Sequence, residues 1–359
     1  MSMKKHLRRW PVILALVLAA LCAFSFWRLH AVSRLLPSQQ AAERWKGDGE
    51  RNFAQHSFFL PAEQKLTRDQ VYSFRNDMAQ KLKGASYDIE KEKGLYSDAW
   101  SLSASVKVSA GRRSGEVQAF AVGGSFFDFH PLRLLSGNYL RPEDLMEDRV
   151  LLDRETAWLL FGAVDLAGMS FSIGGTPFVV AGVYEHESDG FSKAALADGM
   201  CIYMSYDAFI RLFPENTGIS CYELVMAEPV KGFAHGAAEE KFPVKQAELV
   251  DNSYRYSMDR LFKLLKAGSA RSMHKGSTVY PYWENAARAA EDRAALWLAA
   301  GLVSGAFPVA LGLVELIRYA VRGRKKMEED VLPSATARGR EFIRELRRRR
   351  WERRHPGEY

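Results

Sequence analysis

The sequence predicts an α+β extracytoplasmic domain inserted between two transmembrane helices, and three observations lead to this prediction. Two long apolar segments lie near the two ends of the 359-residue chain. The stretch between them mixes amphipathic helical runs with alternating, strand-like runs. Basic residues crowd both ends, although the net charge is only +7. The charged fraction of 26% excludes both a protein made mostly of membrane spans and a disordered polar chain.

Residues 10–28 are predicted to form the first transmembrane helix, after a cytoplasmic N-terminus at residues 1–9. The stretch from Trp10 to Trp27 carries no charge and is long enough to cross a bilayer. The residues before it include four cations, Lys4, Lys5, Arg8 and Arg9. The positive-inside rule therefore places this end in the cytoplasm. A cleaved signal peptide is the alternative, because Ala23-Phe24-Ser25 resembles a small-residue cleavage site.

Residues 294–320 are predicted to form the second transmembrane helix. Its internal charges, Glu315 and Arg318, lie near its C-terminal end, where long side chains reach the membrane surface. Residues 321–359 form a basic tail, which the positive-inside rule also places in the cytoplasm. Both termini are therefore expected inside the bacterial plasma membrane, with residues of about 29–293 outside it.

Small residues on the second span favour close packing against another helix. Gly301 and Gly305 are four residues apart and share one helix face, and Pro308 is expected to bend the helix just beyond them. The alternative is that glycine is simply frequent in membrane spans. The face could contact the spans of a partner protein or a second copy of this chain.

Between the spans, the sequence predicts a stalk at residues 29–56, the α+β domain at residues 57–255 and stalk helices at residues 256–293. The first stalk rests on helical composition that ends at Gly47. The cationic ends account for the positive charge of the chain, so the outer domain is mildly acidic. We therefore expect the lipid bilayer as a partner of the cationic ends and no nucleic acid.

Local patterns predict the elements of the outer domain in order. Thr67 and Gln70 form a capping box before a helix whose apolar face includes Phe74. Residues 99–108 and 116–122 alternate as a β-hairpin, and Gly174-Gly175 joins a second hairpin. Further strands are expected at residues 57–60, 149–153, 201–204 and 221–226, and further helices at residues 155–162, 206–213, 258–266 and 283–298.

The order of short motifs resembles the MacB-like periplasmic core domain of permease subunits in MacB/FtsX-type ABC transporters. The residues that carry the resemblance are aromatic and glycine positions, Phe126, Phe127, Gly137, Phe161, Gly162, Gly168 and Gly182. These residue types fill a core and permit tight turns, so we interpret them as structural. The resemblance implies that the domain couples movements of membrane helices to an extracytoplasmic substrate or partner.

The resemblance also implies a separate ATPase, and permease subunits as further partners. The sequence contains no Walker A pattern, so we expect no cofactor on this chain and ATP use by a partner subunit. Permeases of this type carry four spans, whereas this sequence shows two apolar segments. The alternative is therefore a stand-alone membrane-anchored binding or scaffold protein without transport activity.

The sequence offers weak candidates for chemistry. The run Glu185-His186-Glu187 is interpreted as a solvated polar loop rather than a metal site, and His130 and His235 as isolated loop histidines. A hydrolase that uses Ser272 or the His186 loop is the least favoured function. We expect no catalytic residue and no metal site on this chain.

The two cysteines of the outer domain, Cys201 and Cys221, lie on expected strands about 20 residues apart. A disulfide bridge forms between them only if those strands are neighbours with matching register. Two buried free thiols are the alternative.

Overall fold

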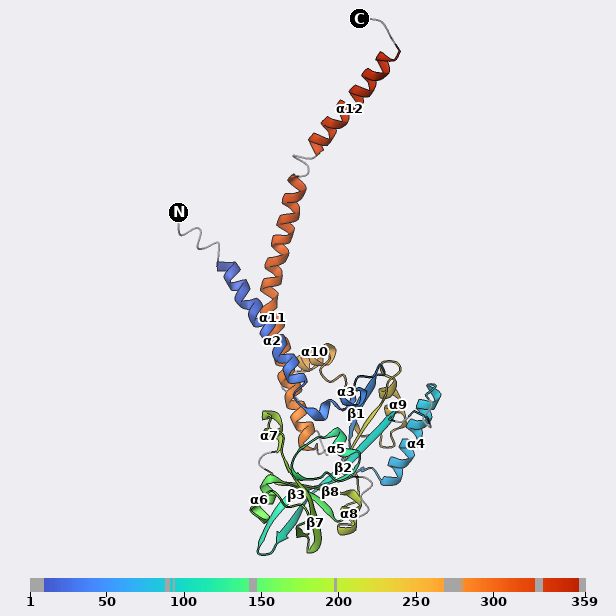
Figure 1. The fold of residues 1–359 in the computed structure, drawn as a ribbon, viewed down its shortest axis with the longest axis vertical. Coiled ribbons are helices and arrows are strands. Elements are labelled where there is room, and N and C mark those ends of the chain that lie inside the picture. The colour runs from blue at the N-terminus through green and yellow to red at the C-terminus, as the bar shows by residue number, and fades with distance from the viewer. Residues whose placement is uncertain are drawn as a thin grey trace. The chain divides into compact units, whose positions relative to one another are not determined.

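The computed structural model describes residues 10–87, 91–92, 94–141, 147–196, 199–267, 278, 280–326 and 332–354. The chain divides into two compact units. Residues 27–298 form the outer domain, and residues before 27 and after 298 form the second unit, which holds most of the apolar helices. Figure 1 labels their elements.

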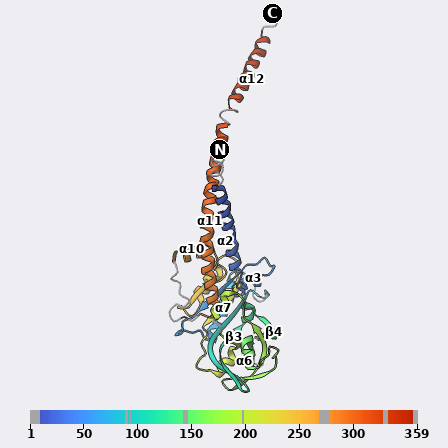
Figure 2. The same cartoon turned by 90° about the vertical axis from the view of Figure 1, so that its left-hand side faces the viewer.

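Ten strands of the described residues form one sheet in the order β10-β1-β9-β2-β3-β8-β5-β7-β4, and β6 pairs with both β2 and β7. The strands are β1 Phe53–Phe59, β2 Tyr96–Ala110, β3 Arg113–Gly124, β4 Arg133–Gly137, β5 Arg149–Asp153, β6 Ser170–Ile173, β7 Thr176–Glu185, β8 Cys201–Ser205, β9 Cys221–Ala227 and β10 Glu248–Asp251. Because β6 bridges β2 and β7, six strands pair in a closed ring, which faces the viewer in Figure 2.

The long strand β2 belongs to both halves of this sheet. Its first part, Tyr96–Ser101, pairs with β9, and residues Val108 and Ser109 near its end pair with β6. Strands β9, β1 and β10 therefore extend the ring as an open antiparallel sheet. An open sheet has two faces to cover, and helices cover both.

The described helices of the outer domain are short, apart from α4 and the two that enter the second unit. They are α3 Ala41–Lys46, α4 Arg68–Gly84, α5 Phe126–Phe129, α6 Arg154–Leu160, α7 Gly190–Leu196, α8 Tyr206–Leu212, α9 Phe233–Lys241 and α10 Met258–Ala267, with a 3₁₀ turn η1 at Pro37–Gln39. Helices α2 Trp10–Ser33 and α11 Tyr282–Lys326 contribute to both units, and α12 spans Leu332–Glu352.

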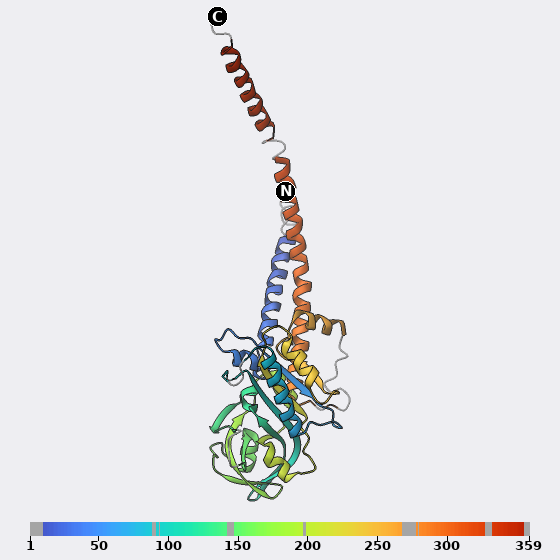
Figure 3. The same cartoon turned by 90° about the vertical axis from the view of Figure 1, so that its right-hand side faces the viewer.

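Strand β1 shows how the two faces of the open sheet are covered, because alternate residues of a strand point to opposite faces. Phe58 stacks on Phe242 just after α9 and meets Phe74 of α4 edge to face. Its neighbour Phe59 faces the other way and packs on Tyr280, just before α11. Helices α4 and α9 thus cover one face, where Figure 3 shows them side by side, and α3, α5 and the start of α11 cover the other.

Most of the local predictions are confirmed. The β2–β3 and β6–β7 hairpins form as expected, with Gly174 and Gly175 in the turn of the second. The Thr67–Gln70 capping box is present at the start of α4. The prediction missed β10 and placed the first domain boundary too late. Within the expected stalk, residues 29–56, helix α3 packs on β1 and buries Ala41, and β1 itself begins at Phe53.

In the outer domain, the end of α2 lies beside α11. The guanidinium carbon of Arg28 is 5.7 Å from the centre of the Trp297 ring. The first and last helical segments of this domain therefore meet.

The second unit contains the larger part of α2 and the C-terminal part of α11, and both helices are long and apolar enough to cross a membrane. Gly301 faces α2, where a β-carbon would come within 3.0 Å of the Phe26 ring. Gly305 likewise approaches the Cys22 sulfur. The small-residue face is thus occupied by α2 of the same chain. Pro308 lies inside α11, which continues to Lys326.

Candidate functional site

A row of charged residues marks the first turns of α11. Glu284, Arg288 and Glu291 follow one another at spacings of four and three residues, which places them on one helix face. All three are buried in the outer domain. Since buried charges persist only when they are paired, this face must find partners in the domain beneath it.

The central partner is Arg255, which follows β10 and is fully buried. One guanidinium nitrogen donates to Glu284 Oε2 at 2.6 Å and to Asn252 Oδ1 at 3.1 Å. The other terminal nitrogen lies 3.5 Å from Glu291 Oε2, and Arg260 of α10 donates to the second oxygen of Glu291 at 2.6 Å. Arg255 therefore joins two turns of α11 to the end of strand β10.

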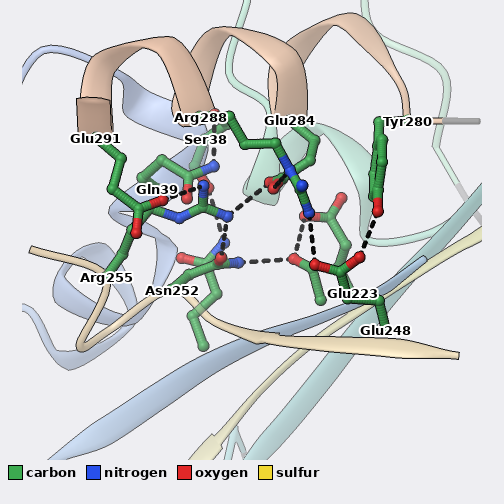
Figure 4. A network of polar contacts seen from close by, with 12 residues as sticks. Ser38, Gln39, Glu223, Glu248, Asn252, Arg255, Tyr280, Glu284, Arg288 and Glu291 are labelled. Carbon is green, nitrogen blue, oxygen red and sulfur yellow. Dashed lines mark hydrogen bonds and ion pairs between the residues drawn. The ribbon is translucent and has the colours of Figure 1, made fainter. Parts of the chain in front are cut away.

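Arg288 forms a second connection between the helix and the sheet. It donates to Glu284 Oε1 and to Glu248 Oε1 of β10, both at 2.7 Å. Its guanidinium also lies 3.9 Å from the centre of the Tyr280 ring, and the Tyr280 hydroxyl donates to Glu248. Figure 4 shows these groups converging between the helix and the strands.

The polar contacts continue across the sheet from Asn252. Its amide nitrogen donates to the Ser57 hydroxyl of β1 at 2.6 Å, and Ser57 donates to Glu223 Oε1 of β9 at 3.0 Å. The other Glu223 oxygen lies 2.5 Å from Nε2 of His130, at the end of α5. We call this chain of side chains the coupling network, and define it as Glu284, Arg288, Glu291, Arg255, Glu248, Asn252, Ser57, Glu223 and His130.

The electrostatics of the network keep it charged. Burial disfavours the charged form of Arg255, but Glu284 and Glu291 outweigh this effect and raise the pKa of the guanidinium above its usual range. The same balance, with Glu284 and Glu248 as partners, raises the pKa of Arg288. Removing one partner from such a buried pair typically costs about 3–5 kcal/mol, because the other charge is left unpaired. The network therefore holds the first turns of α11 firmly against β10, β1 and β9.

An aromatic cluster makes a second link between α5 and α11. The Trp283 ring lies 4.7 Å from the His130 ring and 5.6 Å from Phe126, measured between ring centres. His130 also stacks on Phe126 at 4.5 Å. The first turn of α11 thus reaches α5 both directly and through the network.

The comparisons with known proteins identify the family of this domain. The profile of the MacB-like periplasmic core domain matches residues 47–241, more than half of the chain. The chain belongs to the MacB-like periplasmic core domain family. No curated protein matches it. With its two candidate membrane helices, the chain is a membrane protein with an extracytoplasmic domain and a permease-like component of the ABC-transporter type.

The solved structures that this chain resembles share little sequence identity with it. The extracellular domain of the noncanonic ABC-type transporter YknZ from Gram-positive bacteria shares 13% identity with a TM-score of 0.38, covering 55% of this chain and 100% of that one. The periplasmic region of MacB from Actinobacillus actinomycetemcomitans shares 15% identity with a TM-score of 0.44, covering 60% and 94%. The family assignment rests on the sequence profile.

The residues that carry the resemblance to the MacB-like domain lie in the core, at close contacts between strands and in turns. Gly137 of β4 and Gly182 of β7 are cross-strand partners, and a β-carbon on either would lie within 2.5 Å of the other strand's backbone. Phe126 is buried in the aromatic cluster, and Phe127 stacks on Tyr139 at 4.9 Å between ring centres. The remaining positions are Phe161 at the end of α6, and Gly162 and Gly168, which have φ of 72° and 87°.

Three interpretations of histidine-containing segments need correction. His235 is not an isolated loop histidine, because it lies on α9 with its ring centre 5.5 Å from that of His56. His130 is not an isolated loop histidine, because it is buried and paired with Glu223. The loop at residues 185–189 is more than a solvated polar loop. His186 Nε2 lies 3.1 Å from Asp153, Glu185 pairs with Arg133 and Arg154, and Glu187 accepts from Tyr282 of α11. Ser272, the other hydrolase candidate, lies outside the described residues.

The sequence left open a disulfide bridge or two buried free thiols, and the structure shows free thiols. Cys201 of β8 and Cys221 of β9 are both buried free thiols. Two strands, β2 and β3, separate β8 from β9 in the sheet. With strands spaced about 4.8 Å apart, the two cysteines are roughly 14 Å apart across the sheet, which is beyond the reach of a disulfide bond.

Proposed function

We propose that this chain is a non-enzymatic coupling subunit of an ABC-type complex in the bacterial plasma membrane. Residues of about 29–293 lie outside the membrane, and both termini lie in the cytoplasm. The outer domain binds a substrate or partner protein, and movements of α2 and α11 change that binding. A separate ATPase supplies the energy, so this chain needs no cofactor of its own.

The observation that supports this proposal is the coupling network. Helix α11 is a single element from Tyr282 to Lys326, and its first turns carry Glu284, Arg288 and Glu291. A helix is stiff along its axis, so a displacement of the apolar part acts on these turns. The buried ion pairs then oblige β10, β1 and β9 to follow, because slipping past them would leave charges unpaired. The distribution of charge favours the proposed orientation.

Site-specific crosslinking in intact cells tests the proposal. Gly301 and Gly305 already face α2, so the crosslinking residue belongs on the opposite face of α11. Val303 is suitable because 77% of its surface is exposed. A photo-crosslinking amino acid at Val303 is expected to capture a permease or ATPase, identified by mass spectrometry. The matched control is the adjacent Ser304, which is buried against its own unit and should give only intramolecular products.

The outcomes separate the proposed function from its alternative. An ATPase or an ATPase-linked permease among the Val303 products supports a coupling subunit. Self-crosslinks alone would overturn it in favour of a stand-alone anchored scaffold. With the captured complex in hand, Asn252→Ala should leave assembly intact and reduce the response of ATP hydrolysis to the outer domain. Ser103→Ala, an exposed β2 position, is the control.

A further inference from the structure

A second polar cluster lies on the opposite face of β1 from the coupling network. His56 of β1 and Asp251 of β10 are directly opposite each other in the antiparallel pair. His235 comes from α9, which packs on β1, and its ring centre lies 5.5 Å from that of His56. One ligand-type atom from each of the three side chains lies within 4.8 Å of the others.

Three buried ring nitrogens of the two histidines lack hydrogen-bond partners among the described residues. His56 has no exposed surface, and neither of its ring nitrogens forms a hydrogen bond among the described residues. Nε2 lies 3.7 Å from Asp251 Oδ2, which is too long for a hydrogen bond. Nδ1 of His235 is likewise buried without a partner. Native structures rarely leave a buried imidazole in this condition, because its desolvation is then uncompensated.

We propose that His56, His235 and Asp251 bind one divalent transition-metal ion, with zinc as the best fit. Two imidazole nitrogens and one carboxylate oxygen form a common zinc ligand set, with a fourth position left for water. Tetrahedral ligands about 2.0–2.1 Å from zinc lie about 3.3 Å from one another. The separation of 3.7 Å between His56 and Asp251 is already close to this value.

The surroundings agree with metal binding. A neutral imidazole keeps one ring nitrogen unprotonated, and that nitrogen is available to bind a metal ion. Asp251 Oδ1 accepts from the backbone nitrogen of Tyr254, which orients the carboxylate and leaves Oδ2 directed at His56. The His235 side chain is 41% exposed and gives the ion a route from solvent.

A second group of potential ligands, Asp153, Glu155 and His186, serves as a comparison. There one histidine nitrogen already has a partner, since His186 Nε2 lies 3.1 Å from Asp153 Oδ2, whereas its Nδ1 is buried without one among the described residues. Asp153 Oδ1 also accepts from the backbone nitrogen of Thr156 at the start of α6. Both Asp153 oxygens and His186 Nε2 are therefore already paired, unlike the two ring nitrogens of His56, so this group provides the control for the experiment.

Cobalt(II) titration of the full-length protein in detergent, after treatment with a chelator, tests the proposal. Tetrahedral Co²⁺ absorbs in the visible range, and one equivalent is expected to bind and be displaced by Zn²⁺. Asp251→Asn and His235→Ala should each weaken binding at least tenfold. The side chains of Asp251 and His235 both reach the surface, so these two variants are expected to fold. Far-UV circular dichroism checks this. His186→Gln should bind Co²⁺ like the wild type.

Two results would overturn the site. The first is a wild-type protein that takes up no Co²⁺ or Zn²⁺ at micromolar concentration. The second is binding that survives both Asp251→Asn and His235→Ala, or that disappears in His186→Gln instead. Neither result bears on the crosslinking test of the coupling function, which relies on the second unit.

Discussion

Neighbouring residues of β1 begin two polar clusters that differ in how fully their groups are satisfied. Ser57 belongs to the coupling network, in which each carboxylate and guanidinium described above meets an opposite charge or a hydrogen-bond donor, although Nε of Arg255 forms no hydrogen bond among the described residues. His56 points to the other face and has two nitrogens without hydrogen bonds. One strand thus carries a closed polar network on one face and an open set of ligand atoms on the other.

This difference teaches how to tell a structural polar cluster from a binding site. A closed network stabilises one arrangement of the chain and resists displacement, which suits a mechanical joint. An open cluster costs free energy until something completes it, which suits a ligand. Substitution of polar by apolar residues should therefore have opposite effects on the two faces of β1.

The largest expected effect comes from breaking the closed network. Arg255→Met leaves Glu284 and Glu291 buried without their shared cation and should lower the free energy of unfolding by about 3–5 kcal/mol. Denaturant unfolding of the full-length protein, followed by circular dichroism, measures the change. Arg154→Met, which removes an exposed ion pair, should change stability by less than about 1 kcal/mol. Equal effects of the two variants would contradict a joint made of buried charges.

The next effect should have the opposite sign. His56→Leu replaces an unsatisfied imidazole by an apolar side chain of similar size and should stabilise the metal-free protein by about 1–3 kcal/mol. Gln55→Leu is the matched control on the network face of the same strand, because Gln55 accepts from Ala41 and donates to Ser38. That variant should be destabilised. With excess zinc, the wild type should have a higher free energy of unfolding than His56→Leu. A His56→Leu variant that remains the more stable of the two in zinc would count against the metal site.

The third effect concerns the two thiols, depends on pH and is the smallest per residue. Burial raises the pKa of both Cys201 and Cys221 above their usual range. Above about pH 9 the unfolded chain releases thiol protons that the folded domain retains, so stability should fall as pH rises, by up to about 1.4 kcal/mol per pH unit for each thiol. Unfolding measured at pH 8.5, 9 and 10 checks this, and Cys201→Ala/Cys221→Ala should flatten the dependence.

Thiol counting under denaturing conditions sharpens the same point. Without reductant, the unfolded wild type should react with a maleimide at both Cys201 and Cys221, as free thiols do. The native domain should leave both unlabelled, because they are buried. A bridged pair in the unfolded, unreduced protein would contradict the strand order.

The sequence predicted those parts of the fold that depend on short stretches of chain. The Thr67–Gln70 box and the Gly174-Gly175 turn are three and two residues long, and their chemistry acts locally. The strand order cannot be read from local patterns, so the sequence left both a Cys201–Cys221 bridge and two free thiols open; two strands separate the cysteines. The resemblance to the MacB-like domain was found from glycine and aromatic positions, and the family profile over residues 47–241 confirms it.

The candidate functional site was largely missed for the same reason. Ser57 and Asn252 are 195 residues apart, and His130 and Glu223 are 93 residues apart. No local pattern connects such partners, so His130 looked isolated. One signal was available, because Glu284, Arg288 and Glu291 put three charges on a single face of a helix. The metal candidate had no such signal, since His56, His235 and Asp251 come from three distant segments.

The meeting of Arg28 and Trp297 has a consequence for how such proteins arise in evolution. A domain whose ends are adjacent fits into a loop between two neighbouring helices without forcing them apart, whatever its length. Gene rearrangement could therefore transfer the entire domain between membrane proteins with different numbers of spans. Because its two ends are adjacent, the outer domain is also suited to insertion into a loop of an engineered receptor.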